Sequence, residues 1–173
     1  VALARALAPE PQLLLLDEPF SNLDGELRRK LSHEVRDILK ARGTSAILVT
    51  HDQEEAFAVS DHVGVFKEGR LEQWDTPYNL YHRPANRFVA DFVGQGVFLP
   101  AKALDGHQLQ IELGTLQGDA QGLDQLEVLL RPDDVVHDDA APTQAEVVHK
   151  AFRGAERLLA VDQEPRVQGV VLP

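Results

Sequence analysis

The sequence predicts an α/β fold with a parallel sheet, followed by a small all-β module of the barrel or sandwich type. Two short, continuously apolar segments, residues 13–16 and 46–49, are separated by a helical stretch, as in a strand–helix–strand crossover within one parallel sheet. After about Val97 the chain changes to short segments in which apolar and polar residues alternate, which is typical of half-buried strands. We therefore expect two domains, residues 1–95 and 96–173.

The first helix and the first strand are separated by prolines. Residues 1–8 are rich in Ala and Leu and predict a helix, which Pro9 and Pro11 stop. Residues 13–16 are four leucines. Because leucine favours helices, composition alone leaves this segment open, and its short length before a polar stop decides for a strand that is buried on both faces.

A longer helix and a second strand follow. Residues 26–42 carry apolar side chains at helical spacing, and Gly43 stands where a C-terminal glycine cap belongs. Residues 46–49 predict a second buried strand. Asp52 together with Glu55 predicts a capping box that opens the next, shorter helix.

The next stretch predicts a hairpin and two short helices. Residues 62–66 and 70–74 flank a Glu-Gly turn, and the helices open on a Thr-Pro pair and break at Pro84. We expect Trp74 and Tyr78 to pack the hairpin against these helices. The strands expected in the second domain are residues 108–113, 126–130, 146–152, 157–161 and 167–172.

Charge and composition exclude several functions. The 173 residues carry 17 Lys and Arg against 28 Asp and Glu, a net charge of −11, and the basic residues form no sustained run, so we do not expect nucleic acid as a partner. Cysteine is absent, which excludes disulfides and thiolate metal sites, and the seven His residues are dispersed. No stretch approaches the ~20 apolar residues of a membrane span, so any membrane role requires a protein partner.

Polar side chains at the ends of the first two strands predict an active site. Asp17 and Glu18 end the first strand, and His51 ends the second. Because parallel strands end at one edge of the sheet, we expect these three residues to converge on one ligand. One carboxylate can hold Mg²⁺, directly or through water, while the other orients and deprotonates a water for attack on a γ-phosphate. Without His51, an exposed acidic pair with no function is the better interpretation.

Three stretches resemble the ATP-binding cassette (ABC) ATPases. The string LLLLDEPFSNLD at residues 13–24 resembles the Walker B strand and D-loop of that family. Residues 1–8 resemble the helix that follows the signature loop, and residues 49–56 resemble the switch-histidine segment. The resemblance therefore extends over roughly the first half of the chain and implies the C-terminal part of a P-loop NTPase domain.

The resemblance implies roles for individual residues. Asp17 binds Mg²⁺ through water, Glu18 is the general base or water-polarising residue, and His51 contacts the γ-phosphate. Asp24, and with it Ser21, lies at an interface between two ATPase subunits. The implied cofactors are ATP and Mg²⁺, and the implied partners are a second copy of the subunit and transmembrane permease subunits.

The later sequence resembles one group of these ATPases. Residues 69–94 are similar to importer ATPases that carry a C-terminal oligonucleotide-binding-like (TOBE) β domain, which regulates or supports the dimer. This stretch, including residues 96–100, is most similar to bacterial ferric-iron uptake ATPases, although polyamine, sulfate and sugar importers share much of it. The resemblance implies a peripheral protein on the cytoplasmic face of the bacterial inner membrane, which meets a periplasmic solute-binding protein only indirectly.

The sequence departs from the family in one respect. It has no G-x-x-x-x-G-K-[ST] string, Q-loop or signature glycines, so no residues cradle the phosphates. It also has no Met at position 1 and opens like the interior of a helix, so we expect a fragment, with an incomplete β domain, that does not hydrolyse ATP alone. Two alternatives remain: a soluble ABC-type ATPase that acts on DNA or the ribosome, and a non-catalytic module whose tail senses a small anion.

Overall fold

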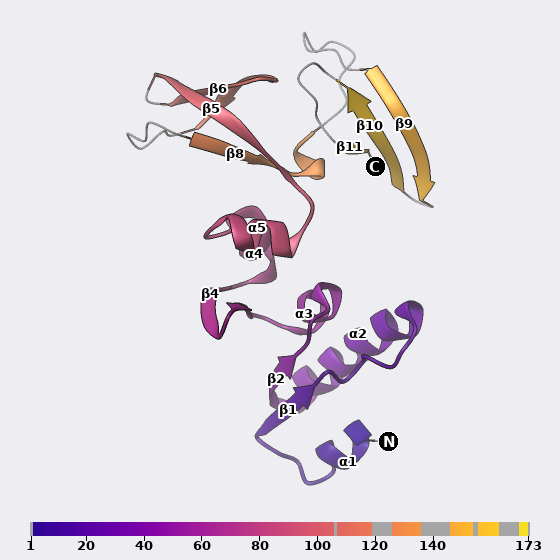
Figure 1. The fold of residues 1–173 in the computed structure, drawn as a ribbon. Helices are drawn as coiled ribbons and strands as arrows, with labels where there is room; N and C mark the ends of the chain where they lie inside the picture. The colour runs from indigo at the N-terminus through magenta and orange to yellow at the C-terminus, as the bar shows by residue number, and fades with distance from the viewer. Residues whose placement is uncertain are drawn as a thin grey trace. The chain divides into compact units, whose positions relative to one another are not determined.

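The computed structural model describes residues 2–105, 107–118, 126–135, 146–153, 156–162 and 170–172. The chain divides into two compact units, Val1–Val93 and Gly94–Pro173. The first unit mixes helices with short strands and the second contains antiparallel sheets (Figure 1). Within the described residues, no helix combines the length and the hydropathy that crossing a bilayer requires.

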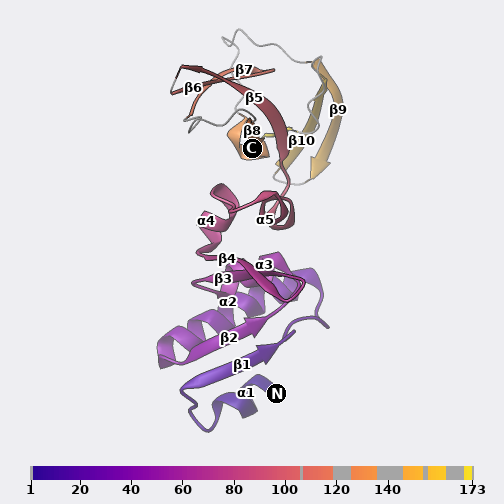
Figure 2. The same ribbon diagram turned by 60° about the vertical axis from the view of Figure 1, so that its left-hand side comes forward.

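The first part of unit 1 is a strand–helix–strand crossover. Its elements are α1 (Ala2–Leu7), β1 (Leu13–Asp17), α2 (Gly25–Arg42), β2 (Ser45–Val49) and α3 (Gln53–Val59). Strands β1 and β2 pair in parallel, with Leu13 opposite Ser45 and Asp17 opposite Val49 (Figure 2). The predicted parallel crossover is confirmed.

Both ends of α2 are set by local chemistry, and of the two caps the sequence predicted only Gly43. Asp24 Oδ1 accepts a hydrogen bond from the Leu27 backbone N–H at 3.0 Å, which caps the first turn. At the other end Gly43 adopts φ 62°, the left-handed conformation that glycine takes without steric cost. The apolar side of α2 then packs on the sheet, where Leu14, Val35 and other side chains form a buried core.

The prediction that the two strands are buried on both faces is wrong. Leu14 is only 5% exposed because it faces the core with α1 and α2, whereas its neighbour Leu15 is 69% exposed. Among the described residues nothing covers the second face of this two-stranded sheet. Its exposed apolar side chains are Leu13, Leu15, Ile47 and Val49.

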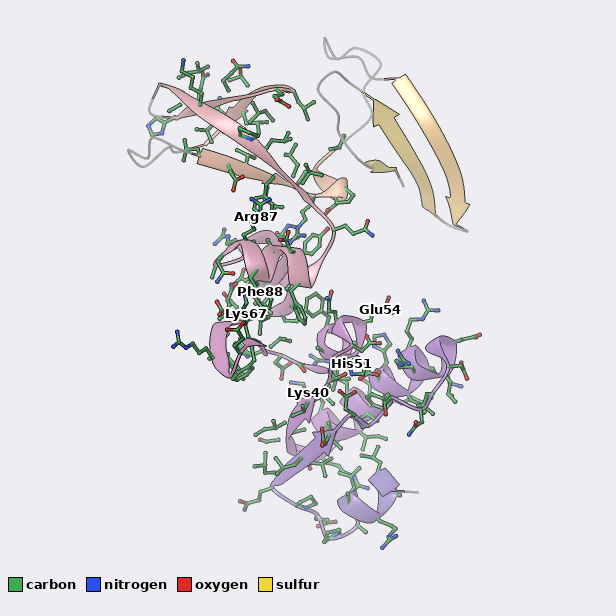
Figure 3. All side chains as sticks on the ribbon, in the orientation of Figure 1. Lys40, His51, Glu54, Lys67, Arg87 and Phe88 are labelled. Carbon is green, nitrogen blue, oxygen red and sulfur yellow. The ribbon has the colours of Figure 1, made fainter. Side chains whose placement is uncertain are left out.

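The rest of unit 1 is a hairpin followed by two helices, as predicted. Its elements are β3 (Val63–Lys67), β4 (Arg70–Asp75), α4 (Pro77–His82) and α5 (Arg87–Val93). Val65, Leu80, Val89 and Val93 form their common core. Lys67 Nζ lies 4.5 Å from the centre of the Phe88 ring, a cation–π contact between the hairpin and α5 (Figure 3).

The expected packing of Trp74 and Tyr78 is wrong. Trp74 is 62% exposed because it pairs with Gly64, on the face of the hairpin opposite the core residue Val65. Its ring stacks instead on that of His62. Tyr78 is also exposed, and its ring contacts that of His82, one turn along α4.

The described residues of unit 2 form two antiparallel sheets. The first has the order β7-β6-β5-β8 and the second the order β11-β10-β9. The elements are β5 (Val97–Asp105), β6 (Gln108–Ile111), β7 (Gly114–Gln117), β8 (Leu126–Leu130), the 3₁₀ turn η1 (Pro132–Asp134), β9 (Glu146–Arg153), β10 (Glu156–Asp162) and β11 (Val170–Leu172).

The strands of unit 2 differ in part from those that the sequence predicts. The strand expected over residues 108–113 ends at Ile111, and the chain turns before β7 begins at Gly114, whose φ is 140°. Strand β7 was not predicted, and neither was strand β5. Strand β5 contains Pro100, which a strand tolerates here because β5 pairs only with β8 at that point. Of the segment expected at 167–172, residues 167–169 lie outside the described residues.

Candidate active site

The predicted acid and imidazole meet at the carboxyl ends of β1 and β2. The Nδ1 atom of His51 lies 2.7 Å from Oε1 of Glu18, a hydrogen-bonded contact between residues 33 positions apart. The Glu18 backbone N–H also donates to the Val49 carbonyl at 2.8 Å, which extends the sheet register by one residue. Parallel pairing therefore brings together two side chains that the helix α2 separates in sequence. His51 stands beside the start of α3 (Figure 3).

Glu18 has two features that distinguish it from an ordinary surface carboxylate. Its backbone is in the left-handed region, with φ 47°, a conformation that few non-glycine residues adopt and that clusters at functional sites. Its second oxygen, Oε2, is buried and accepts no hydrogen bond from the described residues. A buried carboxylate oxygen without a donor is suited to hold a water molecule.

His51 presents its free edge to solvent. Its side chain is 81% exposed, and Nδ1 is engaged with Glu18, so Nε2 remains available to a ligand. The hydrogen bond to Glu18 and the charge of that carboxylate raise the pKa of His51 above its ordinary value of 6.5. The contact therefore favours the imidazolium form, which attracts anions such as phosphate.

Asp17 lies beside this pair as an exposed carboxylate at the end of β1. Among the described residues, no three His, Cys, Asp or Glu side chains gather to form a metal cage. Mg²⁺ is commonly held by only one or two carboxylates, with water and substrate phosphates completing its coordination. Asp17 fits that mode of binding and does not fit a site built entirely from protein ligands.

The loop between β1 and α2 folds back on Glu18. Ser21 Oγ donates to the Glu18 carbonyl at 3.0 Å, and the Ser21 backbone N–H donates to the same oxygen at 3.3 Å. Asp24 caps α2 and does not contact Glu18 or His51 through any hydrogen bond among the described residues. The structure thus brings together Glu18, His51 and Ser21, while Asp24 lies at the far end of the loop.

The capping box expected at α3 is only half formed. Asp52 Oδ1 accepts from the Glu55 N–H at 3.1 Å, as predicted. Glu55 does not return to Asp52, because its Oε2 accepts from Thr50 Oγ1 at 2.7 Å, and Thr50 Oγ1 in turn accepts from the Asp52 N–H. Glu55 therefore holds the residues on both sides of His51, Thr50 through its buried carboxylate and Asp52 through its backbone N–H.

Sequence analysis missed Arg28, a residue of α2 whose side chain lies between the loop and the His51 segment. Its only local signal was a position in the first turns of an amphipathic helix, which does not distinguish it from the adjacent Arg29. The contacts of Arg28 depend on the crossover geometry and could not be deduced from spacing.

Comparison with known proteins identifies close relatives. No protein-family model matches the chain. It is 45% identical over 138 residues to the sulfate/thiosulfate import ATP-binding protein CysA 2 of Chromobacterium violaceum, a match covering 79% of this chain. It is 43% identical over 135 residues to the Fe(3+) ions import ATP-binding protein FbpC of Haemophilus influenzae, covering 77% of this chain. The matched region spans 38% of each relative's length.

Proposed function

The chain belongs to the ATP-binding proteins of ABC importers, and we propose that it supplies the water-activating part of an ATP-hydrolysing site. The observation that carries this proposal is the Glu18–His51 contact at the ends of two parallel strands. The remaining part of the site, the phosphate-cradling loop, comes in this proposal from outside the chain, which spans 38% of the relatives it matches.

Each residue has a proposed task. Glu18 orients the attacking water at its buried Oε2 and accepts a proton from it, while His51 contacts the γ-phosphate with the ring edge that faces away from Glu18. Asp17 binds Mg²⁺ through water. When bound, Mg²⁺ neutralises charge on the phosphate oxygens.

The domains and partners follow from the same proposal. Residues 1–95 form the C-terminal portion of a P-loop nucleotide-binding domain, and residues 96–173 form an oligonucleotide-binding-like TOBE domain. The division into two units and the antiparallel sheets after Gly94 support this organisation. Ser21 and Asp24 belong to an interface between two ATPase subunits. These subunits bind transmembrane permease subunits at the cytoplasmic face of the membrane and meet a solute-binding protein only indirectly.

The proposed solute is an inorganic ion, either ferric iron or sulfate. The relatives named for these two solutes match at 43% and 45% identity, so the two receive nearly equal support. Uptake of radiolabelled iron or sulfate by cells that depend on this ATPase separates them. If deletion of this ATPase reduces neither iron uptake nor sulfate uptake, both proposed solutes are contradicted and a polyamine or sugar importer is favoured.

The test of the catalytic proposal is Glu18→Gln in the full-length protein. Glutamine keeps the size and the hydrogen-bonding capacity but cannot accept the proton, so we expect ATP binding to be retained and hydrolysis to fall by about 100-fold or more. Glu54→Gln is the matched control, because it makes the same chemical change at an exposed residue of α3, and it should leave turnover unchanged. Wild-type turnover by Glu18→Gln would remove Glu18 from this role. The 173-residue chain alone is expected to show no Mg²⁺-dependent hydrolysis.

A further inference from the structure

The side chain of Arg28 contacts two segments that are far apart in sequence, since Leu23 and Asp52 are separated by 29 positions. Its Nη1 donates to Asp52 Oδ2 at 2.5 Å, and its Nη2 donates to the Leu23 carbonyl at 3.1 Å. Its Nε lies 3.4 Å from Oε1 of Glu55. One planar guanidinium thus has three partners, two on the segment after β2 and one on the loop after β1.

Both segments that Arg28 contacts are connected to the Glu18–His51 pair. On the segment after β2, Asp52 directly follows His51, and Glu55 holds Thr50, which directly precedes His51. On the loop after β1, which contains Leu23, Ser21 donates two hydrogen bonds to the Glu18 carbonyl. These contacts form one continuous network, in which Arg28 connects the loop after β1 to the segment that contains His51.

Burial makes this link difficult to replace. Glu55 is only 2% exposed, and Arg28 is 27% exposed. A carboxylate removed from water to this extent is costly unless it is paired and hydrogen-bonded. Burial pushes the pKa of Asp52 upward, but the Glu55 N–H and the Arg28 guanidinium outweigh it, so this pKa lies below its ordinary value. Arg28 therefore faces two carboxylates at once.

We infer that Arg28 is a positioning residue, which holds His51 against Glu18 and couples its position to the loop of Ser21 and Asp24. This inference rests on the proposed function of the pair. A displacement of the loop pulls on the Leu23 carbonyl, and the rigid guanidinium transmits the displacement to Asp52 and so to His51. A subunit interface at the loop is thereby linked to the γ-phosphate contact.

The first experiment compares Arg28→Lys with Arg36→Lys in the full-length protein. Lysine keeps the charge but cannot reach three partners with a planar fork. We expect kcat for ATP hydrolysis to fall by about 10- to 100-fold while KM changes by less than about twofold, because misplacement affects the transition state more than binding. Arg36 is the matched control, since it also lies on α2 and bonds the end of α3, through Val59 and Asp61, away from His51. Arg36→Lys should keep the wild-type kcat.

A second experiment tests positioning by chemical rescue. In Arg28→Ala, millimolar guanidinium should restore part of kcat, and it should not do so in Arg36→Ala. If Arg28→Lys or Arg28→Ala does not fold, Asp52→Asn decides, because asparagine still caps α3 but weakens the contact with Arg28. We then expect the same fall in kcat.

The outcomes separate this inference from the proposed function. Normal kcat in a folded Arg28→Lys or in Asp52→Asn, or an increase in KM alone, overturns the positioning role. Because Glu18→Gln is assayed in parallel, loss of hydrolysis there leaves the proposed function intact even when the Arg28 result is negative. Normal hydrolysis in Glu18→Gln removes the proposed function itself.

Discussion

Glu18 combines a strained backbone with a chemically specific side chain. The left-handed conformation costs about 1–3 kcal/mol at a non-glycine residue and persists only where the surroundings impose it. Here two sets of hydrogen bonds hold the backbone of Glu18: its N–H donates to the Val49 carbonyl, and its carbonyl accepts from Ser21. Glycine would relieve the strain but has no carboxylate. The site therefore retains glutamate at the expense of stability.

This strain predicts an unusual order of stabilities at position 18. Glu18→Ala and Glu18→Gly both remove the carboxylate, but only glycine accepts φ 47° freely, so the Gly variant should be more stable than the Ala variant by about 1 kcal/mol. At Glu54, inside helix α3, the order should reverse by about 0.5–1 kcal/mol. Urea denaturation of the four variants measures both differences. An Ala variant that is the more stable at position 18 contradicts the strain.

The pair also predicts a titration. Since the pKa of His51 is raised in the folded chain, the contact stabilises the fold fully below pH 6.5 and this contribution is lost as the pH rises through the raised value. Glu18→Gln should lower the pKa of His51 toward 6.5, because both the hydrogen bond to an ionised group and the negative charge are weakened. NMR titration of the ring measures it, with Glu54→Gln as the control. An unchanged pKa in Glu18→Gln contradicts the contact in solution.

At the scale of elements, local sequence signals predicted where helices begin and end better than they predicted which faces of the strands are buried. The limits of α2 follow from Asp24 and Gly43, which act on neighbouring backbone groups. The burial of β1 depends on what lies above and below the sheet, which no local signal specifies. Likewise the turn after Ile111 interrupts an alternation of apolar and polar residues that continues in the sequence through Leu113.

The one-sided sheet predicts contrasting effects for two adjacent leucines. Leu14→Ala leaves a cavity among the side chains of the core and should cost about 2–5 kcal/mol. Leu15→Ala, on the exposed face, should cost less than about 1 kcal/mol. Urea denaturation of this chain measures both. Equal costs contradict the one-sided burial, because they require a covering on the second face.

At the scale of the whole molecule, the acidic balance is the dominant electrostatic property. Negative residues exceed positive ones by 11, and the ion pairs of Arg36 and Lys40 with Asp61 lie at the surface, where pairs contribute little. Repulsion among unpaired carboxylates therefore opposes the compact state.

This balance predicts that salt stabilises the chain. Raising NaCl from about 10 mM to about 500 mM shortens the Debye length from ~30 Å to about 4 Å, which screens the long-range repulsion more than the short ion pairs. The Tm should increase, as thermal unfolding followed by circular dichroism can measure. Sodium sulfate is unsuitable for this test because sulfate also strengthens apolar burial. A lower Tm at high salt contradicts the prediction and indicates that attractive pairs dominate.

The sequence by itself determined the order of elements in unit 1, the parallel crossover and the residues Asp17, Glu18 and His51 as one candidate site. These follow from periodicity, capping residues and the rule that parallel strands end at one edge, all of which act locally or through simple topology. Only the tertiary structure decided that one face of the sheet is exposed, that Glu18 is strained, and that Arg28 joins the loop to the His51 segment. These features depend on distances between residues remote in sequence, because exposure and ion pairing arise only after the chain has folded.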